Sequence, residues 1–374
     1  MSGVAIAAGS PLAADAGRVI AEAGGNAVDA AIAAVVASMC TDPGIIAPGA
    51  GAFIAVWPSD GPPVVIDAYA EMPGRGLSPE QFGEGARRVA MEYGGGIETL
   101  IGHGSVATPG AFAGLGAAHD RFGSMPWADL LEPTIVAVAG GFPLSGAAAE
   151  YLSYSHEIIF GWDPESHAAL HHPDGSPITL GETVRLPALA DTLRALAAEG
   201  PALLYEGELG GLLVAAARDN GGLITKADLA QYRAVEREPT LVRIGEWTVA
   251  TNPPPAVGGA CMAAMLLLME EAHLASWSGA EVRKVADAQR SVLTYRRGSL
   301  DGAADRAAAV TELLDLARIG DVSSILSAPS TSHSSTVDAE GAACAITVSA
   351  GYGSGAMIPG TGFWLNNSLG EIEL

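Results

Sequence analysis

Residues 330–333 read Ser-Thr-Ser-His and stand where a segment rich in small residues enters an alternating, partly apolar stretch. Serine and threonine hydroxyls are weak nucleophiles near neutral pH and need a base within hydrogen-bonding reach. A threonine at the start of a polypeptide carries such a base in its own α-amino group, whose reference pKa is about 8. Thr331 is therefore a candidate nucleophile, provided that the peptide bond from Ser330 is first broken.

Self-cleavage at this bond needs only groups that the sequence supplies. The Thr331 hydroxyl would attack the carbonyl carbon of Ser330, water would open the resulting ester, and Thr331 would keep a free amino group. The alternative for a Ser-Thr cluster before a strand is a surface linker without chemistry. The residue pattern alone leaves both interpretations open.

A β-hairpin is predicted to position this cluster. Residues 331–337 and 343–349 alternate, and Asp338-Ala339-Glu340-Gly341 between them is a turn sequence. The turn brings the second strand, which carries Thr347 and Ser349, back beside Thr331 within cross-strand distance.

The rest of the chain predicts helices that flank antiparallel strands, which is an α+β fold in layers. Ser10-Pro11 and Asn26 are expected to begin two helices that end near Ala23 and Asp42-Pro43. Residues 74–105 are expected to be an irregular, glycine-rich loop. Further helices are predicted over 109–123, 125–142, 187–199, 207–220, 259–271 and most of 275–328, a helical turn at 225–228, and strands over 51–57, 64–72, 240–251 and 358–366.

The last predicted strand, 358–366, has no following partner in the sequence. Such a strand would leave an unpaired sheet edge, so we expect the natural chain to continue past Leu374.

Composition narrows the partners that the protein could have. A net charge of −23 disfavours binding to nucleic acid and to anionic membranes. The N-terminal residues lack a basic signal region, and the apolar run from Ala27 to Cys40 is too short to span a bilayer, so we expect a cytoplasmic protein. The three cysteines and the histidines show no spacing typical of a metal site, and we expect none.

Several blocks of the sequence resemble the gamma-glutamyltransferase family, in that family's order. SPLAADAGRVIAEAGGNAVDAAIAA is similar to its opening helices and PGAGAFIAVW to its first glycine-rich strand. SVATPGAFAGLGAAHDRFG, NGGLITKADLAQYRAVEREP and NPPPAVGG follow in series, and TSHSSTVDAEGAACAITVSAGYGSG resembles the region around the family's self-cleavage threonine. The resemblance covers almost the whole chain.

The resemblance implies roles for particular residues. The family's catalytic threonine falls on Thr331, the first residue of a Thr-Thr-His triplet that reads Thr-Ser-His here. Its Thr-x-Thr pair, whose second hydroxyl supports the nucleophile, reads Thr347-Val348-Ser349. The acid that binds the α-amino group of the substrate falls on Glu371, after Asn366-Asn367. Asn367 and Ser368 take the places of further polar substrate contacts.

Three departures from the family pattern stand out. The arginine that holds the substrate's α-carboxylate is replaced by Ala70, before Glu71; Arg75 is the nearest substitute, with an ordinary surface arginine as the alternative. The asparagine that follows the Thr-x-Thr pair is missing. The family's Ser-Ser-Met and Gly-Gly segments, which supply oxyanion donors, would follow Leu374.

The resemblance implies an αββα N-terminal-nucleophile hydrolase that acts on γ-glutamyl amides of glutathione-like type, without metal or organic cofactor. Self-cleavage would divide one intertwined domain into residues 1–330 and 331–374, as a heterodimer or within a larger oligomer. Two alternatives stay open. Ala70 favours an amidase or acylase for another acyl group, and the missing segments favour a non-catalytic relative.

Overall fold

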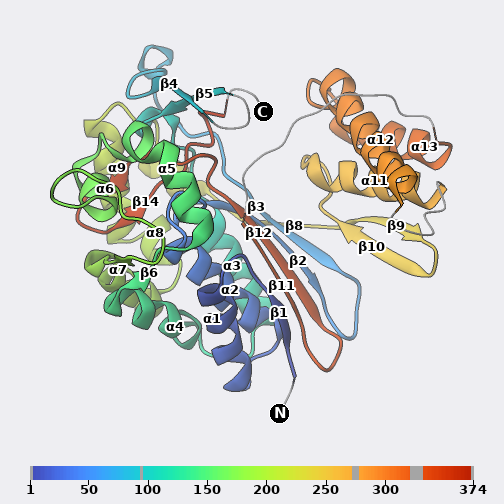
Figure 1. Ribbon diagram of the computed structural model, residues 1–374, viewed down its shortest axis with the longest axis horizontal. Coiled ribbons are helices and arrows are strands. Elements are labelled where there is room, and N and C mark those ends of the chain that lie inside the picture. Colours follow the sequence, from blue (N-terminus) through green and yellow to red (C-terminus); the bar gives the residue numbers. More distant parts are fainter. Residues whose placement is uncertain (1–2, 93–95, 272–277, 321–331, 372–374) are drawn as a thin grey trace. The chain divides into compact units, whose positions relative to one another are not determined.

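The computed structural model describes residues 3–92, 96–271, 278–320 and 332–371. They fall into two compact units, the first made of residues 1–60, 66–235 and 330–374 and the second of 61–65 and 236–329. The chain passes from the first unit to the second after Val235 (Figure 1). The described residues of the second unit build a hydrophobic core of their own, and the expectation of one intertwined domain of residues 1–330 and 331–374 stays a prediction.

The first unit is built on a sheet that contains the predicted hairpin. Its strand order is β1-β11-β12-β2-β3-β8, and the pairs β1–β11, β11–β12 and β12–β2 are antiparallel. The returning strand of the hairpin, β12, thus lies between β11 and β2 in the interior of the sheet. The strands are β1 (Ala5–Ala7), β2 (Gly51–Trp57), β3 (Val64–Ala68), β8 (Val235–Arg237), β11 (Ser332–Val337) and β12 (Ala343–Ser349).

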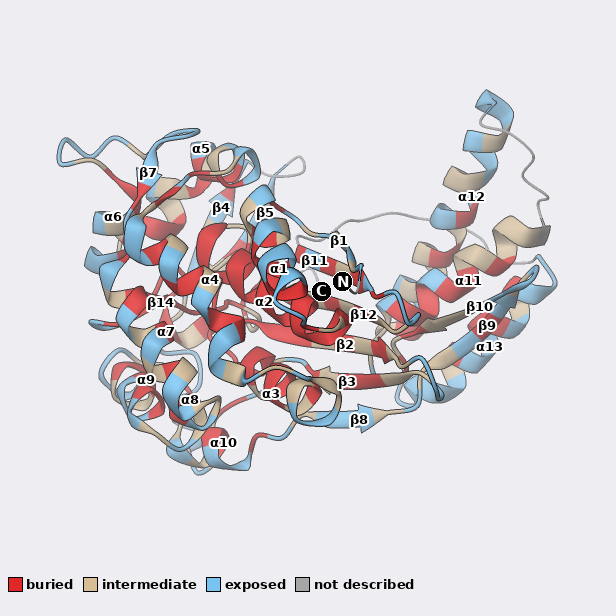
Figure 2. Cartoon of the chain, turned by 90° about the horizontal axis from the view of Figure 1, so that it is seen from below, coloured by how far each residue is buried: buried red, intermediate tan, exposed pale blue. Residues whose placement is uncertain are grey.

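Two helices near the N-terminus begin and end where the sequence predicts. Helix α1 (Pro11–Glu22) is capped by the Ser10 hydroxyl, and α2 (Ala27–Thr41) begins with a capping box between Asn26 and Asp29. Every residue of α2 is buried, which its run of alanine and valine allows (Figure 2). Helix α2 packs on β11 and β12, so it forms the layer beneath the hairpin.

The remaining helices of the first unit gather to the left of the sheet in Figure 1. Helix α3 packs on β2 beside α2, and α4 packs on α2. The mixed helix-and-sheet architecture is confirmed, whereas the full αββα layering stays a prediction. These helices are α3 (Ala111–Phe122), α4 (Trp127–Gly140), α5 (Gly146–Phe160), α6 (Pro164–Leu170), α7 (Pro187–Glu199), α8 (Ala202–Tyr205), α9 (Glu208–Asp219) and α10 (Lys226–Gln231).

The second unit contains a hairpin and a group of helices. Its strands pair around Gly245-Glu246, as predicted, and helices α11 and α13 pack on one another. Leu313 and Val292 are among its fully buried side chains. The elements are β9 (Thr240–Ile244), β10 (Trp247–Thr251), α11 (Gly258–Glu271), α12 (Gly279–Tyr295), a π-helical turn (Arg296–Leu300) and α13 (Arg306–Arg318).

The loop prediction for residues 74–105 is wrong. Strands β4 (Arg87–Met91) and β5 (Ile97–Ile101) form an antiparallel hairpin there, and a short 3-10 helix, His103–Ser105, follows. The amide of Leu100 donates to the carbonyl of Gly370, so the hairpin is tied to the C-terminal segment. The many glycines conceal the alternation of these two short strands.

The strand predicted over 358–366 is divided in two. Strands β13 (Met357–Ile358) and β14 (Phe363–Trp364) pair with one another, and the Thr361 hydroxyl closes the turn by donating to the carbonyl of Ile358. Because β14 pairs with β13, the expectation that the last strand of the sequence has no partner is wrong.

A second short antiparallel pair joins β6 (Phe142–Pro143) and β7 (Thr183–Val184).

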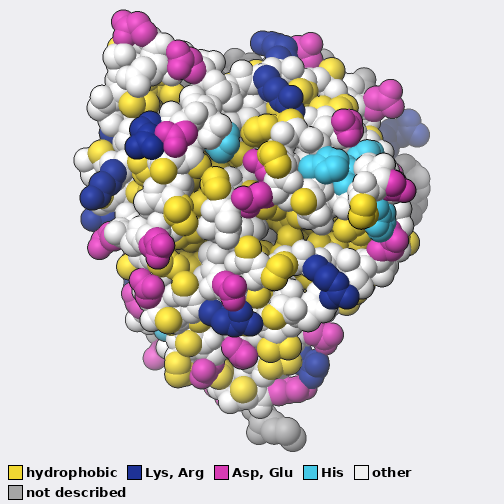
Figure 3. Space-filling view, turned by 90° about the vertical axis from the view of Figure 1, so that its left-hand side faces the viewer, with side chains coloured by type: hydrophobic (Ala, Val, Ile, Leu, Met, Phe, Trp, Pro, Cys, Tyr) yellow, Lys and Arg dark blue, Asp and Glu magenta, His cyan; other side chains and the backbone are white. Residues whose placement is uncertain are grey.

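The described surface carries many more acidic than basic side chains. Figure 3 shows Asp and Glu side chains spread over the visible face, interspersed with apolar ones. None of the described helices combines the length and apolar character needed to cross a membrane.

Candidate active site

The described part of the β11–β12 hairpin begins directly after Thr331. Its register pairs Ser332 with Val348 and His333 with Thr347. Alternation places Ser332, Ser334 and Thr336 on the face covered by α2, where all three are buried. The Thr336 hydroxyl donates to the carbonyl of Ala27 at 2.7 Å, at the first residue of α2.

The opposite face of the hairpin carries His333 together with the hydroxyls of Ser335 and Thr347. The His333 ring joins both strands, with Nδ1 2.8 Å from the Thr347 hydroxyl and Nε2 2.8 Å from the Ser335 hydroxyl. Desolvation of the ring lowers the pKa of His333, which favours the neutral imidazole at physiological pH. Thr347 is thus engaged with His333.

Ser349 ends β12 opposite Gly51. Its hydroxyl accepts one hydrogen bond from the amide of Gly351, at 3.4 Å. The chain after β3 passes close here, because a Cβ built on Gly51 would lie 2.6 Å from the amide nitrogen of Ala70. The last residue of β12, Ser349, therefore pairs with the first residue of β2, Gly51, which lies against Ala70. Ala70 is the residue that replaces the expected arginine.

The loop after Ser349 brings the candidate acid to the same place. Gly351 has φ +63°, and a Cβ there would overlap Asn367 and lie 3.0 Å from Cδ of Glu371. Burial raises the pKa of the Tyr69 phenol, and the negative charge of Glu371 raises it further. The structure thus brings Ser349, Asn367 and Glu371 together around Gly351.

The Asn366-Asn367 pair holds this region in place. Asn367 accepts from the amide of Tyr352 at 2.7 Å and donates to the Thr99 hydroxyl and the Leu100 carbonyl. Both amide side chains are fully buried. Asn367 therefore has a positioning role that the sequence did not predict, and its contact with substrate stays a prediction.

Asn366 makes a second set of bonds beside the first. Its Nδ2 donates to the carbonyls of Gly49 and Ala107, and its Oδ1 accepts from the amides of Ala107 and Ser368. The Ser368 hydroxyl is buried and has no hydrogen-bond partner among the residues that the structure describes. The predicted contact of Ser368 with substrate stays a prediction.

Arg75 lies in an ion-pair cluster. Its guanidinium contacts Glu71 at 3.0 Å and Asp228 at 3.1 Å, and its side chain is 37% exposed. Burial opposes ionisation of Asp228, but hydrogen bonds from Gly74, Thr225 and the Arg75 amide outweigh it and lower the pKa of Asp228. Arg75 is neither a free surface cation nor an unoccupied carboxylate clamp, and its predicted role in binding substrate stays untested.

The proposed nucleophile and scissile bond, Thr331 and Ser330, lie outside the described residues. His333 and Tyr69 are neighbours of the site that the sequence did not single out. The alternation of β11 could have indicated His333, since it lies on the strand face opposite the buried Ser332 and Ser334. Tyr69 gives no comparable signal, because its proximity to Glu371 arises only in the folded chain.

The sequence matches known proteins across nearly its whole length. Residues 13–373 match the family model described as gamma-glutamyltranspeptidase. The chain belongs to the gamma-glutamyltranspeptidase family. This membership confirms the family resemblance.

Relatives in this family include glutathione hydrolase and acylase proenzymes. A glutathione hydrolase proenzyme from Pseudomonas aeruginosa is 30% identical over 396 residues, which span all of this chain and 69% of the relative. An acylase ACY 1 proenzyme from Pseudomonas sp. strain SE83 is 31% identical, over 97% of this chain and 68% of the relative. The solved cephalosporin acylase from Bacillus halodurans superposes with a TM-score of 0.80 at 25% identity, covering 98% of this chain and 69% of that one. A glutathione hydrolase- or acylase-type enzyme class is supported.

Proposed function

We propose that the chain is an amide hydrolase or acyl transferase that forms an acyl-enzyme on Thr331 after the bond from Ser330 is cleaved. The Thr331 hydroxyl attacks the substrate's amide carbonyl, and its α-amine takes the hydroxyl proton and delivers it to the leaving amine. Water, or the amine of an acceptor, then attacks the ester and releases the acyl group. The Ser349 hydroxyl donates to the nucleophile from the adjacent strand.

The observation that carries this proposal is the grouping of Ser349 and Glu371 around Gly351. Ser332 pairs with Val348, so Thr331 and Ser349 are the immediate sequence neighbours of a cross-strand pair. A carboxylate this close to the end of the hairpin can bind a cationic group of the substrate near the reacting amide.

A γ-glutamyl group carries an ammonium and a carboxylate on its α-carbon. Glu371 complements the ammonium of this group. This supports a γ-glutamyl amide as substrate. The glutathione hydrolase among the relatives supports the same class.

A second candidate is an acylase for a different acyl group. Ala70 cannot hold a carboxylate, and Arg75 is already paired with Glu71 and Asp228. A substrate carboxylate would have to compete with both of these acids. The acylases among the relatives and solved structures favour this alternative.

A γ-glutamyl anilide and two anilides that each lack one of its charged groups would separate these functions. The γ-glutamyl anilide carries both α-substituents, the glutaryl anilide lacks the ammonium, and the 4-aminobutyryl anilide lacks the carboxylate. Release of the aniline by wild type, Thr331→Ala and Glu371→Gln would be compared. If Glu371 binds the ammonium, wild type prefers the γ-glutamyl over the glutaryl compound, and Glu371→Gln loses most of that preference.

The other outcomes are equally informative. Preference for the glutaryl anilide supports the acylase, and addition of an amino acceptor separates transfer from hydrolysis. Turnover that survives in Thr331→Ala contradicts the proposed chemistry. A folded wild-type chain that cleaves none of the anilides and stays uncut supports a non-catalytic relative.

A further inference from the structure

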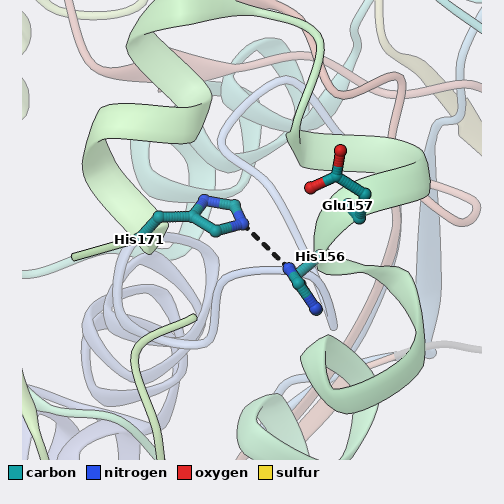
Figure 4. Close-up of side chains that lie close together, drawn as sticks. All are labelled: His156, Glu157 and His171. Carbon is teal, nitrogen blue, oxygen red and sulfur yellow. Dashed lines mark hydrogen bonds between the residues drawn. The ribbon is translucent and has the colours of Figure 1, made fainter. Parts of the chain in front are cut away.

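Two helices of the first unit bring two imidazoles and a carboxylate together, outside the candidate active site. His156 and Glu157 lie on α5, and His171 directly follows α6 as its C-cap residue. Nδ1 of His156 is 2.9 Å from Nε2 of His171, and Figure 4 shows the two rings approaching from separate helices. One ligand atom from each of the three residues lies within 4.8 Å of the others.

The hydrogen bonds of His171 fix which of its nitrogens carries a lone pair. Its Nδ1 lies 3.0 Å from the carbonyl oxygen of His167, which can only accept, so Nδ1 carries the proton. Nε2 is therefore the unprotonated nitrogen, and it faces His156. A histidine whose second nitrogen donates to a backbone carbonyl is oriented in the way that metal-binding histidines commonly are.

The surroundings hold the His171 ring in this orientation. His171 is only 7% exposed, and its ring stacks on that of His167 with centroids 4.0 Å apart and planes 5° apart. The backbone of the residue also forms a bridge with Pro177. One ligand is thus rigid and buried, whereas Glu157 on the neighbouring helix is exposed and can adjust.

We propose that His156, Glu157 and His171 bind one divalent transition-metal ion of the zinc class. Imidazole and carboxylate are ligands that such ions accept, with metal–nitrogen distances of about 2.0–2.1 Å. Two nitrogens 2.9 Å apart can both reach such an ion at a bond angle of about 90°, or at a wider angle after a shift of a few tenths of an ångström. Water would complete the coordination.

The protons balance without an additional reactant. Before binding, His156 donates its Nδ1 proton to Nε2 of His171, since His171 cannot donate from that nitrogen. On binding, His156 gives up the Nδ1 proton to solvent and takes one at Nε2, so the neutral ring changes tautomer. Glu157 binds as the carboxylate.

The site uses none of the residues proposed to act on amides, so it does not depend on the proposed function. It was not expected from the sequence, because its ligands lie on two helices and only their packing aligns them. A bound ion would join α5 to the end of α6. Helix α5 also supports the candidate active site, since the Tyr151 hydroxyl donates to the carbonyl of Tyr352 at 2.8 Å.

Equilibrium dialysis of the full chain, without a polyhistidine tag and after treatment with chelator, tests the proposal with Zn²⁺ as the probe. We expect about one Zn²⁺ per wild-type chain, and affinity at least about tenfold weaker in His156→Gln and in Glu157→Gln. His172→Gln is the matched control, because His172 adjoins the site but contacts Glu182 instead. This variant should bind as wild type does.

Two further readouts distinguish a built site from adventitious binding. Zn²⁺ should raise the melting temperature of wild type and His172→Gln but not of His156→Gln. The electron paramagnetic resonance spectrum of added Cu²⁺ should show imidazole nitrogen couplings that His156→Gln reduces. Should His156→Gln fail to fold, the exposed Glu157→Gln takes its place. The proposal is overturned if wild type does not bind Zn²⁺, or if affinity is the same in the ligand variants or falls equally in His172→Gln.

Discussion

Ser349 is the described residue with the most direct part in the proposed chemistry. Among the described residues its hydroxyl makes one long hydrogen bond, with the Gly351 amide, so removing it should cost the fold little. We expect Ser349→Ala to lower kcat by about tenfold to a hundredfold with a nearly unchanged melting temperature, because the nucleophile loses a hydrogen-bond donor. Steady-state kinetics with the preferred anilide and thermal unfolding would measure both effects.

Two variants serve as controls for this prediction. Ser335→Ala removes a hydroxyl from the neighbouring strand, where it contacts His333, and should retain most activity. Ser349→Thr restores the hydroxyl and should restore the rate. If Ser349→Ala keeps the kcat of wild type, the Ser349 hydroxyl has no part in the mechanism.

The lowered pKa of Asp228 makes the free energy of unfolding depend on pH. Its carboxylate is buried and accepts bonds from three backbone amides and from Arg75, and its folded pKa lies below the ordinary value. A depressed folded pKa stabilises the fold above the unfolded pKa, about 3.9, and the contribution disappears as pH falls through the folded value. Asp228→Asn should therefore lose about 1–3 kcal/mol at pH 7 and show a smaller further loss below pH 4.

Denaturant unfolding of wild type and Asp228→Asn between about pH 7 and pH 3 would measure this difference. Asp219→Asn is the control, since that exposed carboxylate pairs only with Arg218 in the described structure. If the free energy of unfolding falls equally with pH in wild type and in Asp228→Asn, the lowered pKa of Asp228 does not contribute to acid stability.

The sequence predicted some residues of the site and missed the roles of others. Glu371 and Ser349 were predicted from their positions in ordered motifs, and the fold brings both to Gly351. The positioning role of Asn367 could not be predicted, because its partner Thr99 is 268 residues away in the sequence. The ion pair of Arg75 with Asp228 could not be predicted either, because the two residues are 153 positions apart in the sequence.

Among the elements, the turn after β12 carries the strongest geometric constraint. Gly351 has a left-handed φ, and a Cβ would overlap the Asn367 side chain. Gly360 also has a left-handed φ, +73°, but a Cβ there would meet no atom within 4 Å. In Gly360→Ala only the backbone strain of the left-handed φ opposes folding. Gly351→Ala adds a steric overlap, so it should destabilise the protein by about 1–3 kcal/mol more than Gly360→Ala.

Chemical denaturation of the two glycine variants gives the comparison directly. Gly351→Ala should also reduce turnover, because the added methyl group displaces Glu371 or Asn367. Equal stabilities for the two variants would mean that the loop has room to move, and that it does not hold the acid in place.

The elements best predicted were those with local signals. Ser10, Asn26 and Thr225 cap helices where their side chains indicated, and the turns at Asp338 and Gly245 close hairpins. Strands β4 and β5 were missed because each has only five residues among glycines, and the C-terminal strand was divided by a turn. Tertiary pairing, rather than local propensity, determines these segments.

At the scale of the whole molecule, the position of the hairpin bears on self-cleavage. Strands β11 and β12 lie between β1 and β2, so ladder bonds join residues after position 331 to the start of the chain on both sides. A break before Thr331 would therefore leave the two pieces associated. The division into residues 1–330 and 331–374 stays a prediction, and the boundaries of the two compact units, after residues 235 and 329, do not depend on it.

Intact-mass analysis with N-terminal sequencing tests the central claim most directly. Protein purified from expression of this sequence should contain two associated polypeptides, the smaller beginning at Thr331, whereas Thr331→Ala should remain one chain. Amide turnover by a preparation in which the bond between Ser330 and Thr331 is intact would contradict the account.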